Sequence, residues 1–149
     1  MRYFTLSFTL ILLTLVGCGR VGCGRGNTSA GQASNTKANI RTITISRQAL
    51  DNGLSDTLQL GRMHQGEVIA TDIRLVNGDS LPMVILREAT SCGCTKATYS
   101  RKPIAAGTSC DIVVEFDSRS QMGWQMKLME FYFAHSDTPL KIYIDAEVE

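Results

Sequence analysis

LKIYIDAEV, residues Leu140–Val148, alternates apolar and polar side chains from its first position to its last. Successive side chains of a β-strand point to opposite faces, so this pattern predicts a strand with one face in a core and the other in solvent. The predicted core face carries Leu140, Ile142, Ile144, Ala146 and Val148, and the predicted solvent face carries Lys141, Tyr143, Asp145 and Glu147.

The same period of two recurs in shorter stretches upstream, and no long stretch has a convincing helical period. Further strands are expected at Thr42–Ile45, Leu58–Leu60, Glu67–Asn77, Met83–Thr90, Thr95–Tyr99, Cys110–Phe116 and Lys127–Phe133. About seven short, regularly spaced strands predict an all-β domain, an immunoglobulin-like antiparallel β-sandwich, with an open barrel as the alternative. Trp124 falls in a predicted loop.

The N-terminus is typical of a bacterial lipoprotein signal. Arg2 precedes an apolar run from Phe4 to Val16, which is too short to cross a bilayer as a helix, and the run closes on Leu15-Val16-Gly17-Cys18. We therefore predict a signal peptide at residues 1–17 and covalent lipid, such as palmitate, on Cys18. The echo of this motif at Cys23 has Arg20 where an apolar residue is wanted, so Cys18 is the better acceptor.

Residues 18–39 are rich in Gly, Ser, Thr, Asn and Gln, which predicts a flexible tether with a span of roughly 25 Å. Residues 40–149 are then one domain. The net charge of +1 and the absence of a basic patch with interleaved aromatics argue against nucleic acid as a partner. We find no catalytic triad order, phosphate loop or zinc spacing, so we expect no enzyme and no cofactor besides the lipid.

One motif is recognisable: Thr90-Ser91-Cys92-Gly93-Cys94-Thr95, followed by the Pro-Ile-x-x-Gly turn Pro103–Gly107 and by Ile112–Asp117. Together these stretches resemble the bacterial domain-of-unknown-function family 1573. The resemblance implies an immunoglobulin-like domain, often lipid-anchored, with no established activity. Glu88 stands where the pattern has an apolar residue, which predicts a local shift of the strand before the motif.

Cys92 and Cys94 have three possible roles. In an extended strand their Cα atoms lie about 6.6 Å apart, so a direct disulfide requires Gly93 to bend the chain. The pair is either structural, as buried thiols or a stiff bonded turn, or it is a redox site or a soft-metal (copper) site. Cys110 shares the parity of Ile112, so we expect it in the core and, by strand direction, at the opposite end from Cys94.

The same strand parity brings the loops around His64, Cys92 and Trp124 to one end of the sandwich. Candidate redox or metal residues there are Met63, His64, Cys92 and Cys94, with Met122 nearby; the alternative is that Met63, His64 and Met122 are ordinary surface residues. Trp124 and Met122 are candidate partner contacts, because exposed tryptophan is typical of interface anchors. The alternative is that Trp124 folds back to cap the open end.

These observations predict a lipid-anchored envelope module that binds or scaffolds a protein or glycan partner. The alternative function is thiol redox or copper handling through Cys92 and Cys94. Because no acidic residue closely follows Cys18, we expect the periplasmic face of the outer membrane.

Overall fold

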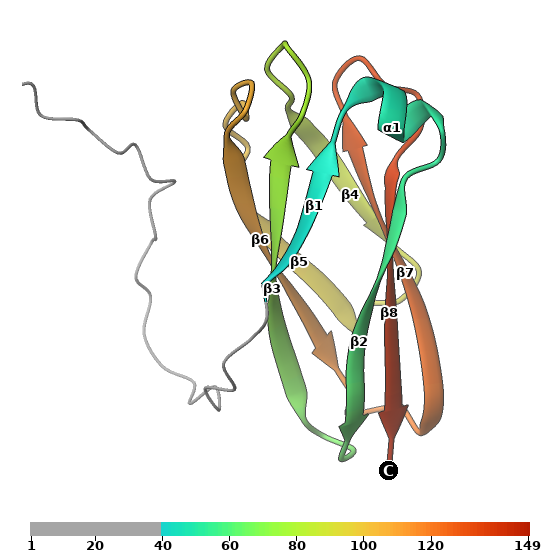
Figure 1. The fold of residues 1–149 in the computed structure, drawn as a ribbon. Coiled ribbons are helices and arrows are strands. Elements are labelled where there is room, and N and C mark those ends of the chain that lie inside the picture. Colours follow the sequence, from blue (N-terminus) through green and yellow to red (C-terminus); the bar gives the residue numbers. More distant parts are fainter. Residues whose placement is uncertain (1–39) are drawn as a thin grey trace, which may run out of the picture.

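The computed structural model describes residues 40–149, which form a sandwich of two four-stranded sheets (Figure 1). The strand order is β1-β3-β6-β5 in sheet A and β2-β8-β7-β4 in sheet B. The predicted all-β sandwich is therefore confirmed. The predicted signal peptide, the lipid acceptor Cys18, the tether and Cys23 lie outside the described residues.

The described part of the chain holds eight strands and one short helix. In order they are β1 (Arg41–Ile45), α1 (Arg47–Asp51), β2 (Ser55–Met63), β3 (Val68–Asn77), β4 (Ile85–Thr90), β5 (Thr95–Tyr99), β6 (Ser109–Asp117), β7 (Gly123–Phe133) and β8 (Leu140–Val148). The predicted bounds of β5 and β8 agree with the structure. Within residues 40–149 no helix is long and apolar enough to cross a membrane.

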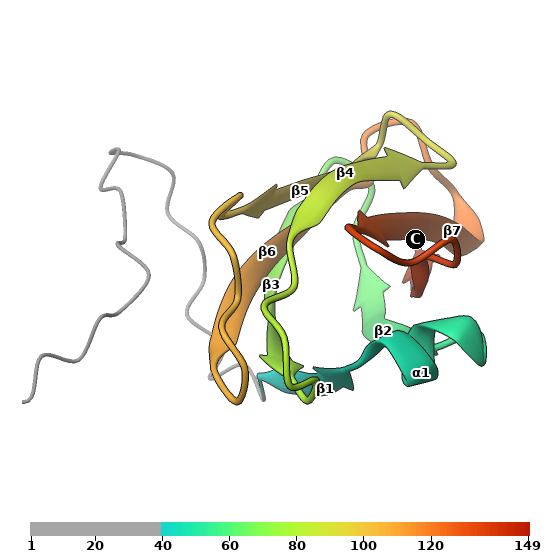
Figure 2. The same cartoon turned by 90° about the horizontal axis from the view of Figure 1, so that it is seen from above.

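The core lies between the two sheets, which face one another when the molecule is viewed from above (Figure 2). Every second residue of β8 points into it, as the alternation of Leu140–Val148 predicts. Phe116 of β6 and Phe131 and Phe133 of β7 are its largest buried side chains. Fully burying one such side chain contributes about 1.5–3 kcal/mol, so these three are among the main stabilising groups of the sandwich.

Two strand pairs at the sheet edges are parallel rather than antiparallel. β1 pairs with β3, and β2 pairs with β8, in the same direction. The remaining pairs are antiparallel. An antiparallel pair follows naturally from a hairpin, but β1 is joined to β3 only through α1 and β2, which belongs to the other sheet. The edge strand β1 is thus free of the hairpin constraint that makes β7 and β8 antiparallel in the centre of sheet B.

β7 begins at Gly123, before the Lys127 at which the sequence places its start. At the start of β7 the outward-facing residues are Trp124 and Met126. Because both are apolar, this part of the strand lacks the alternation of apolar and polar residues that predicts a strand. Their pairing with Glu147 and Asp145 of β8 shows that they are part of the ladder. Trp124 therefore lies in a strand and not in a loop.

A buried asparagine closes the end of the sandwich at which β3 finishes. The Asn77 Nδ2 group donates to the carbonyl oxygens of Leu81 and Ile104, at 2.9 and 2.8 Å, and Asn77 Oδ1 accepts from the Asp79 amide. The Asp79 carboxylate in turn pairs with Arg47 of α1 at 2.9 Å. We call this region, comprising Arg47, Asn77–Leu81 and Ile104–Thr108, the amide end.

Candidate functional site

Trp124 lies on the outer face of sheet B, near the end opposite the amide end. Its side chain is 64% exposed, and its indole Nε1 donates to Asp145 Oδ1 of β8 at 2.8 Å. This hydrogen bond orients the ring against the sheet surface while leaving most of it in solvent. The interpretation of Trp124 as a cap over the open end of the sandwich is therefore wrong, because a cap would be buried between the sheets.

Two methionines flank Trp124 and are also exposed. Met122, in the loop before β7, is 64% exposed, and Met126, the next outward residue of β7, is 43% exposed. Isolated exposed apolar residues are ordinary, but three within five positions of one chain segment are typical of a contact surface. We call Met122, Trp124 and Met126 the tryptophan face.

A shallow hollow of about 280 Å³ lies beside the indole. Its lining comes from three neighbouring strands: Gln59, Gly61 and Arg62 of β2, Asp145, Ala146 and Glu147 of β8, and Trp124 of β7. A β-bulge between Gln59 and Gly61 interrupts the pairing of β2 with β8 at this point. Gly61 adopts a φ of 74°, a backbone conformation that favours glycine, and it contributes no side chain to the hollow.

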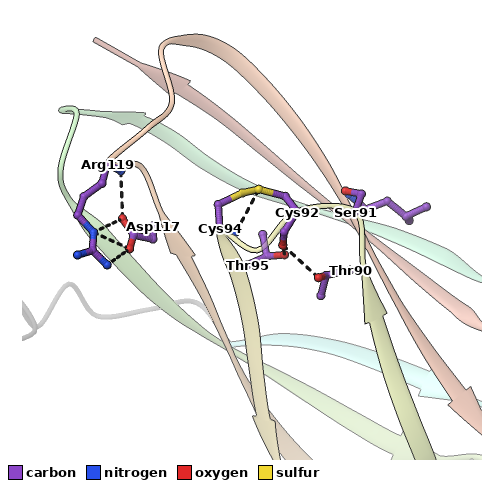
Figure 3. Close-up of a disulfide and its surroundings, with 8 residues drawn as sticks. Thr90, Ser91, Cys92, Cys94, Thr95, Asp117 and Arg119 are labelled. Atoms are coloured by element: carbon purple, nitrogen blue, oxygen red, sulfur yellow. Dashed lines mark hydrogen bonds and ion pairs between the residues drawn. A yellow bond between two sulfur atoms is a disulfide. The ribbon is translucent and has the colours of Figure 1, made fainter.

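Cys92 and Cys94 are joined by a disulfide in the loop between β4 and β5 (Figure 3). Their Cα atoms are 5.1 Å apart, closer than in an extended strand, because the chain bends at Gly93. The structure therefore contains the bonded turn, one of the forms expected for the pair. In this state neither sulfur is a thiolate, so neither is a soft-metal donor.

Hydrogen bonds within the disulfide loop and from β6 stabilise its conformation. The hydroxyls of Thr90 and Thr95 both donate to the Cys92 carbonyl oxygen at 3.0 Å (Figure 3). The Asp117 amide of β6 donates to the Cys94 carbonyl oxygen at 2.8 Å. The loop thus carries the chain from β4 of sheet B to β5 of sheet A, and these hydrogen bonds hold the Thr-Ser-Cys-Gly-Cys-Thr motif in place between the two strands.

Strand parity correctly predicts which loops meet at this end. Gln65 Nε2 donates to the Gln121 carbonyl oxygen, and the buried Ser118 hydroxyl lies 2.9 Å from the carbonyl oxygens of both His64 and Glu67. We call this region, comprising His64–Glu67, Cys92–Cys94 and Ser118–Gln121, the disulfide end.

The candidate donors at the disulfide end do not form one metal-binding set. Met63 is 3% exposed and belongs to the core, which contradicts its assignment as a surface residue, because it is an inward position of β2. His64 is exposed, as is Met122. Among residues 40–149 no three His, Cys, Asp or Glu side chains are grouped so that they would hold a metal ion.

Cys110 occupies the position that its parity predicts. It is 4% exposed, lies in the core, and pairs with Leu75 of β3 in the ladder. Cys110 is the second residue of β6, and the last residue, Asp117, contacts the disulfide loop through its amide. Cys110 therefore lies at the far end of that strand from Cys94. The expectation that Cys94 does not bond to Cys110 is confirmed.

Glu88 is the residue before the cysteine motif that stands where the family pattern has an apolar residue. The β4 register shifts between Ile85 and Arg87, as the sequence predicts. Glu88 then pairs with the inward residue Phe131, and its carboxylate accepts a hydrogen bond from the Tyr99 hydroxyl of β5. Burial, together with this hydrogen bond to Glu88, raises the pKa of Tyr99 to about 12. The pair links the β4 and β5 edges of the two sheets.

Three residues with clear structural roles are not among the candidates predicted from the sequence. They are Asn77 of the amide end, Ser118 of the disulfide end and Asp145 beside Trp124. Asn77 is visible only as part of an Asn-Gly-Asp-Ser turn, and its burial depends on the loops that surround it. Asp145 is visible only as a polar residue on the solvent face of its strand. Its contact with Trp124 follows from the pairing of β7 with β8, which a strand pattern does not specify.

Three solved structures of bacterial proteins have a similar fold. A protein of unknown function from Porphyromonas gingivalis W83 has a TM-score of 0.56 and 18% identity, over 62% of this chain and 44% of that one. The secreted serine protease VesC of Vibrio cholerae has a TM-score of 0.53 and 12% identity, over 68% and 25%. The VesB protease of Vibrio cholerae has a TM-score of 0.52 and 14% identity, over 67% and 33%. The likeness concerns the fold alone, and the chain spans less than half of each of these structures.

No curated protein matches the chain. One family does, and its match covers residues 53–148, from just before β2 to the last residue of β8. β1 and α1 precede the matched region. The match covers most of the chain, including the disulfide loop and the strands of the tryptophan face, so the chain belongs to the family described as "Protein of unknown function (DUF1573)".

Proposed function

We propose that this protein is a lipid-anchored binding module of the bacterial cell envelope. Cys18 carries the lipid, residues 18–39 act as the tether, and the sandwich presents the tryptophan face to a protein or glycan partner on the periplasmic side of the outer membrane. The module is not an enzyme, needs no cofactor beyond its lipid, and does not bind nucleic acid.

The observation that carries this proposal is the exposure of Trp124. An indole that is 64% exposed leaves a large apolar surface in contact with water, which is unfavourable. A partner that covers the ring removes this surface from water, and the complex is stabilised. Tryptophan is among the residues that dominate binding energy at interfaces, particularly when neighbouring groups hold it in place. Asp145 provides such a hold.

Capture from solubilised envelopes tests the binding role. The full-length chain is immobilised in detergent, and the material it retains is compared with that retained by Trp124→Ala. We expect the variant to retain at least about tenfold less, because a central aromatic contact contributes about 2 kcal/mol. Leu81→Ala is the matched control, since Leu81 is 53% exposed but lies at the amide end. Equal retention by Trp124→Ala and the wild type contradicts the proposal.

Cell fractionation tests the anchor. Cys18→Ser should abolish lipid incorporation and release the protein from membranes, because lasting attachment needs the acyl chains. Cys23→Ser is the control and should stay membrane-bound. Membrane attachment that depends on Cys23 instead would contradict the assignment of Cys18.

A second candidate function is thiol–disulfide exchange or copper handling through Cys92 and Cys94. The observation that supports it is the disulfide between these two residues, with the exposed Gly93 between them. In this reaction an external dithiol reduces the disulfide to two thiols and becomes a disulfide itself. Thiol labelling in graded dithiothreitol buffers tests it. Interconversion of the folded protein under mild reductant would support exchange, whereas thiols that become labelled only after unfolding would exclude it. Copper(I) uptake by the reduced protein, absent in Cys92→Ser, would support metal handling.

A further inference from the structure

We propose that the hollow beside Trp124 is a glycan site, in which the face of one neutral sugar ring stacks on the indole and the polar side chains around it bind the hydroxyls. The proposal rests on the binding role proposed above and names the chemical class of its ligand.

The indole is a rigid platform. One face of a pyranose ring presents C–H groups, which pack against an aromatic ring, while its edge presents hydroxyls. The hydrogen bond from Trp124 Nε1 to Asp145 Oδ1, at 2.8 Å, limits rotation of the ring before any ligand arrives. A platform ordered in advance loses little side-chain entropy on binding, which is the general gain from preorganisation.

The side chains around the platform have unused hydrogen-bonding capacity. Within residues 40–149 the side chains of Gln59, Arg62 and Glu147 make no hydrogen bond or ion pair with other protein side chains, although all three line the hollow. Glu147 accepts only, Arg62 donates only, and the Gln59 amide does both. A sugar hydroxyl is both donor and acceptor, so one ring satisfies all three types of group.

The volume of the hollow and the charges around it restrict the class of ligand further. A hollow of about 280 Å³ lies just below the usual range for small-molecule sites, about 300–1,000 Å³, and suits one or two sugar units. Two carboxylates, Asp145 and Glu147, and one guanidinium, Arg62, line it. This excess of negative charge disfavours acidic sugars and an anionic lipid surface. An apolar helix is also a poor fit, because most of the lining side chains are polar.

The shape of the hollow permits a sugar ring to lie close to the backbone of its lining strands. Gly61 has no side chain, and Ala146 is 2% exposed and points into the core, so neither fills the space between Trp124 and β2. The bulge that places Gly61 there also shifts the register between Gln59 and Arg62, bringing both side chains to the hollow from one strand. The bulge therefore has a role in the site as well as in the twist of the edge strand.

The test is a screen of the full-length chain, in detergent, against an array of neutral and acidic oligosaccharides. Trp124 is the only tryptophan, so its fluorescence and its single indole N–H resonance report directly on this site. We expect neutral glycans to bind and to perturb both signals. Trp124→Ala should weaken binding at least about tenfold and Gln59→Ala about threefold, with Leu81→Ala unchanged. Trp124→Phe, which keeps an aromatic face but loses the donor to Asp145, should be intermediate.

Three outcomes decide between the claims. Neutral glycan binding that depends on Trp124 supports this inference. If no glycan binds, or if binding is indifferent to Trp124→Ala, the inference is overturned; envelope capture that still depends on Trp124 would then leave the proposed function standing with a protein partner. Loss of both glycan binding and Trp124-dependent capture overturns the two proposals together.

Discussion

The amide end and the disulfide end both join loops from the two sheets, but they do so with groups of different chemistry. At the amide end one buried side chain, Asn77, makes three hydrogen bonds to the backbone of neighbouring loops. At the disulfide end the Ser118 hydroxyl joins two loops, and a bond between two cysteines with one residue between them stabilises a third. The tryptophan face adjoins the disulfide end, so one end mainly stabilises the fold, while the surface beside the other is available for contact.

Asn77→Ala should have the largest effect on stability, because it removes a buried donor from two carbonyls and an acceptor from one amide. We expect the free energy of unfolding to fall by about 3 kcal/mol in chemical denaturation. Asn52→Ala, at an exposed asparagine, should change it by less than about 0.5 kcal/mol. Similar losses in the two variants would remove the distinction between the ends.

The double variant Cys92→Ser/Cys94→Ser should cost about half as much. The bond spans a sequence separation of 2, so it restricts the unfolded chain little, and the chain-entropy relation gives about 1.5 kcal/mol. The wild-type protein in excess reductant should unfold at the same denaturant concentration as the variant. A loss as large as that of Asn77→Ala would instead make the disulfide the main stabilising element of the domain.

Ser118→Ala should have a smaller effect, about 1 kcal/mol, since only one hydroxyl is lost. The carbonyl oxygens that it contacts keep other partners: the His64 oxygen accepts from the Glu67 amide, and the Glu67 oxygen accepts from the Ser118 amide. Ser120→Ala, at an exposed serine nearby, is the control for equilibrium unfolding. A loss above that of the cysteine variant would show that the hydroxyl, not the bond, closes this end.

The smallest effect expected is the acid sensitivity of the amide end. Hydrogen bonds from Arg47, first from its side chain and then from its backbone, hold the pKa of Asp79 well below its usual range. A carboxyl with a lowered pKa in the folded state stabilises the fold above its unfolded pKa of about 3.9 and loses this contribution as the pH falls toward the folded pKa. The melting temperatures of the wild type and Asp79→Asn should therefore differ at pH 7 and converge in acid. A constant difference would exclude this linkage.

The sequence predicts strands well where one face is buried and the other polar. The Leu140–Val148 alternation defines β8, and parity alone places Cys110 in the core and brings the loops of the disulfide end together. The start of β7 is missed because Trp124 and Met126 are apolar on the solvent side. The alternation of apolar and polar residues by which strands are recognised is therefore lost at this point.

The site depends on information that a strand pattern does not contain. The Cys92–Cys94 bond depends on a bend at Gly93, because an extended chain would hold the two Cα atoms near the upper limit of disulfide geometry. The hollow requires the bulge at Gly61 and the register of three strands, which together bring Gln59, Trp124 and Glu147 side by side. Residue identity predicts Trp124 as a contact, but only the pairing of β2, β8 and β7 assembles its neighbours.

The central claim, that a partner covers Trp124 in the envelope, is tested most directly by hydroxyl-radical footprinting. Oxidation of the single tryptophan is measured in the purified full-length protein and in intact envelopes that contain it, with Leu81 as the internal reference. We predict that Trp124 reacts readily in the purified protein and is protected in envelopes, while Leu81 reacts equally in both. Equal oxidation of Trp124 in the two samples would contradict the claim.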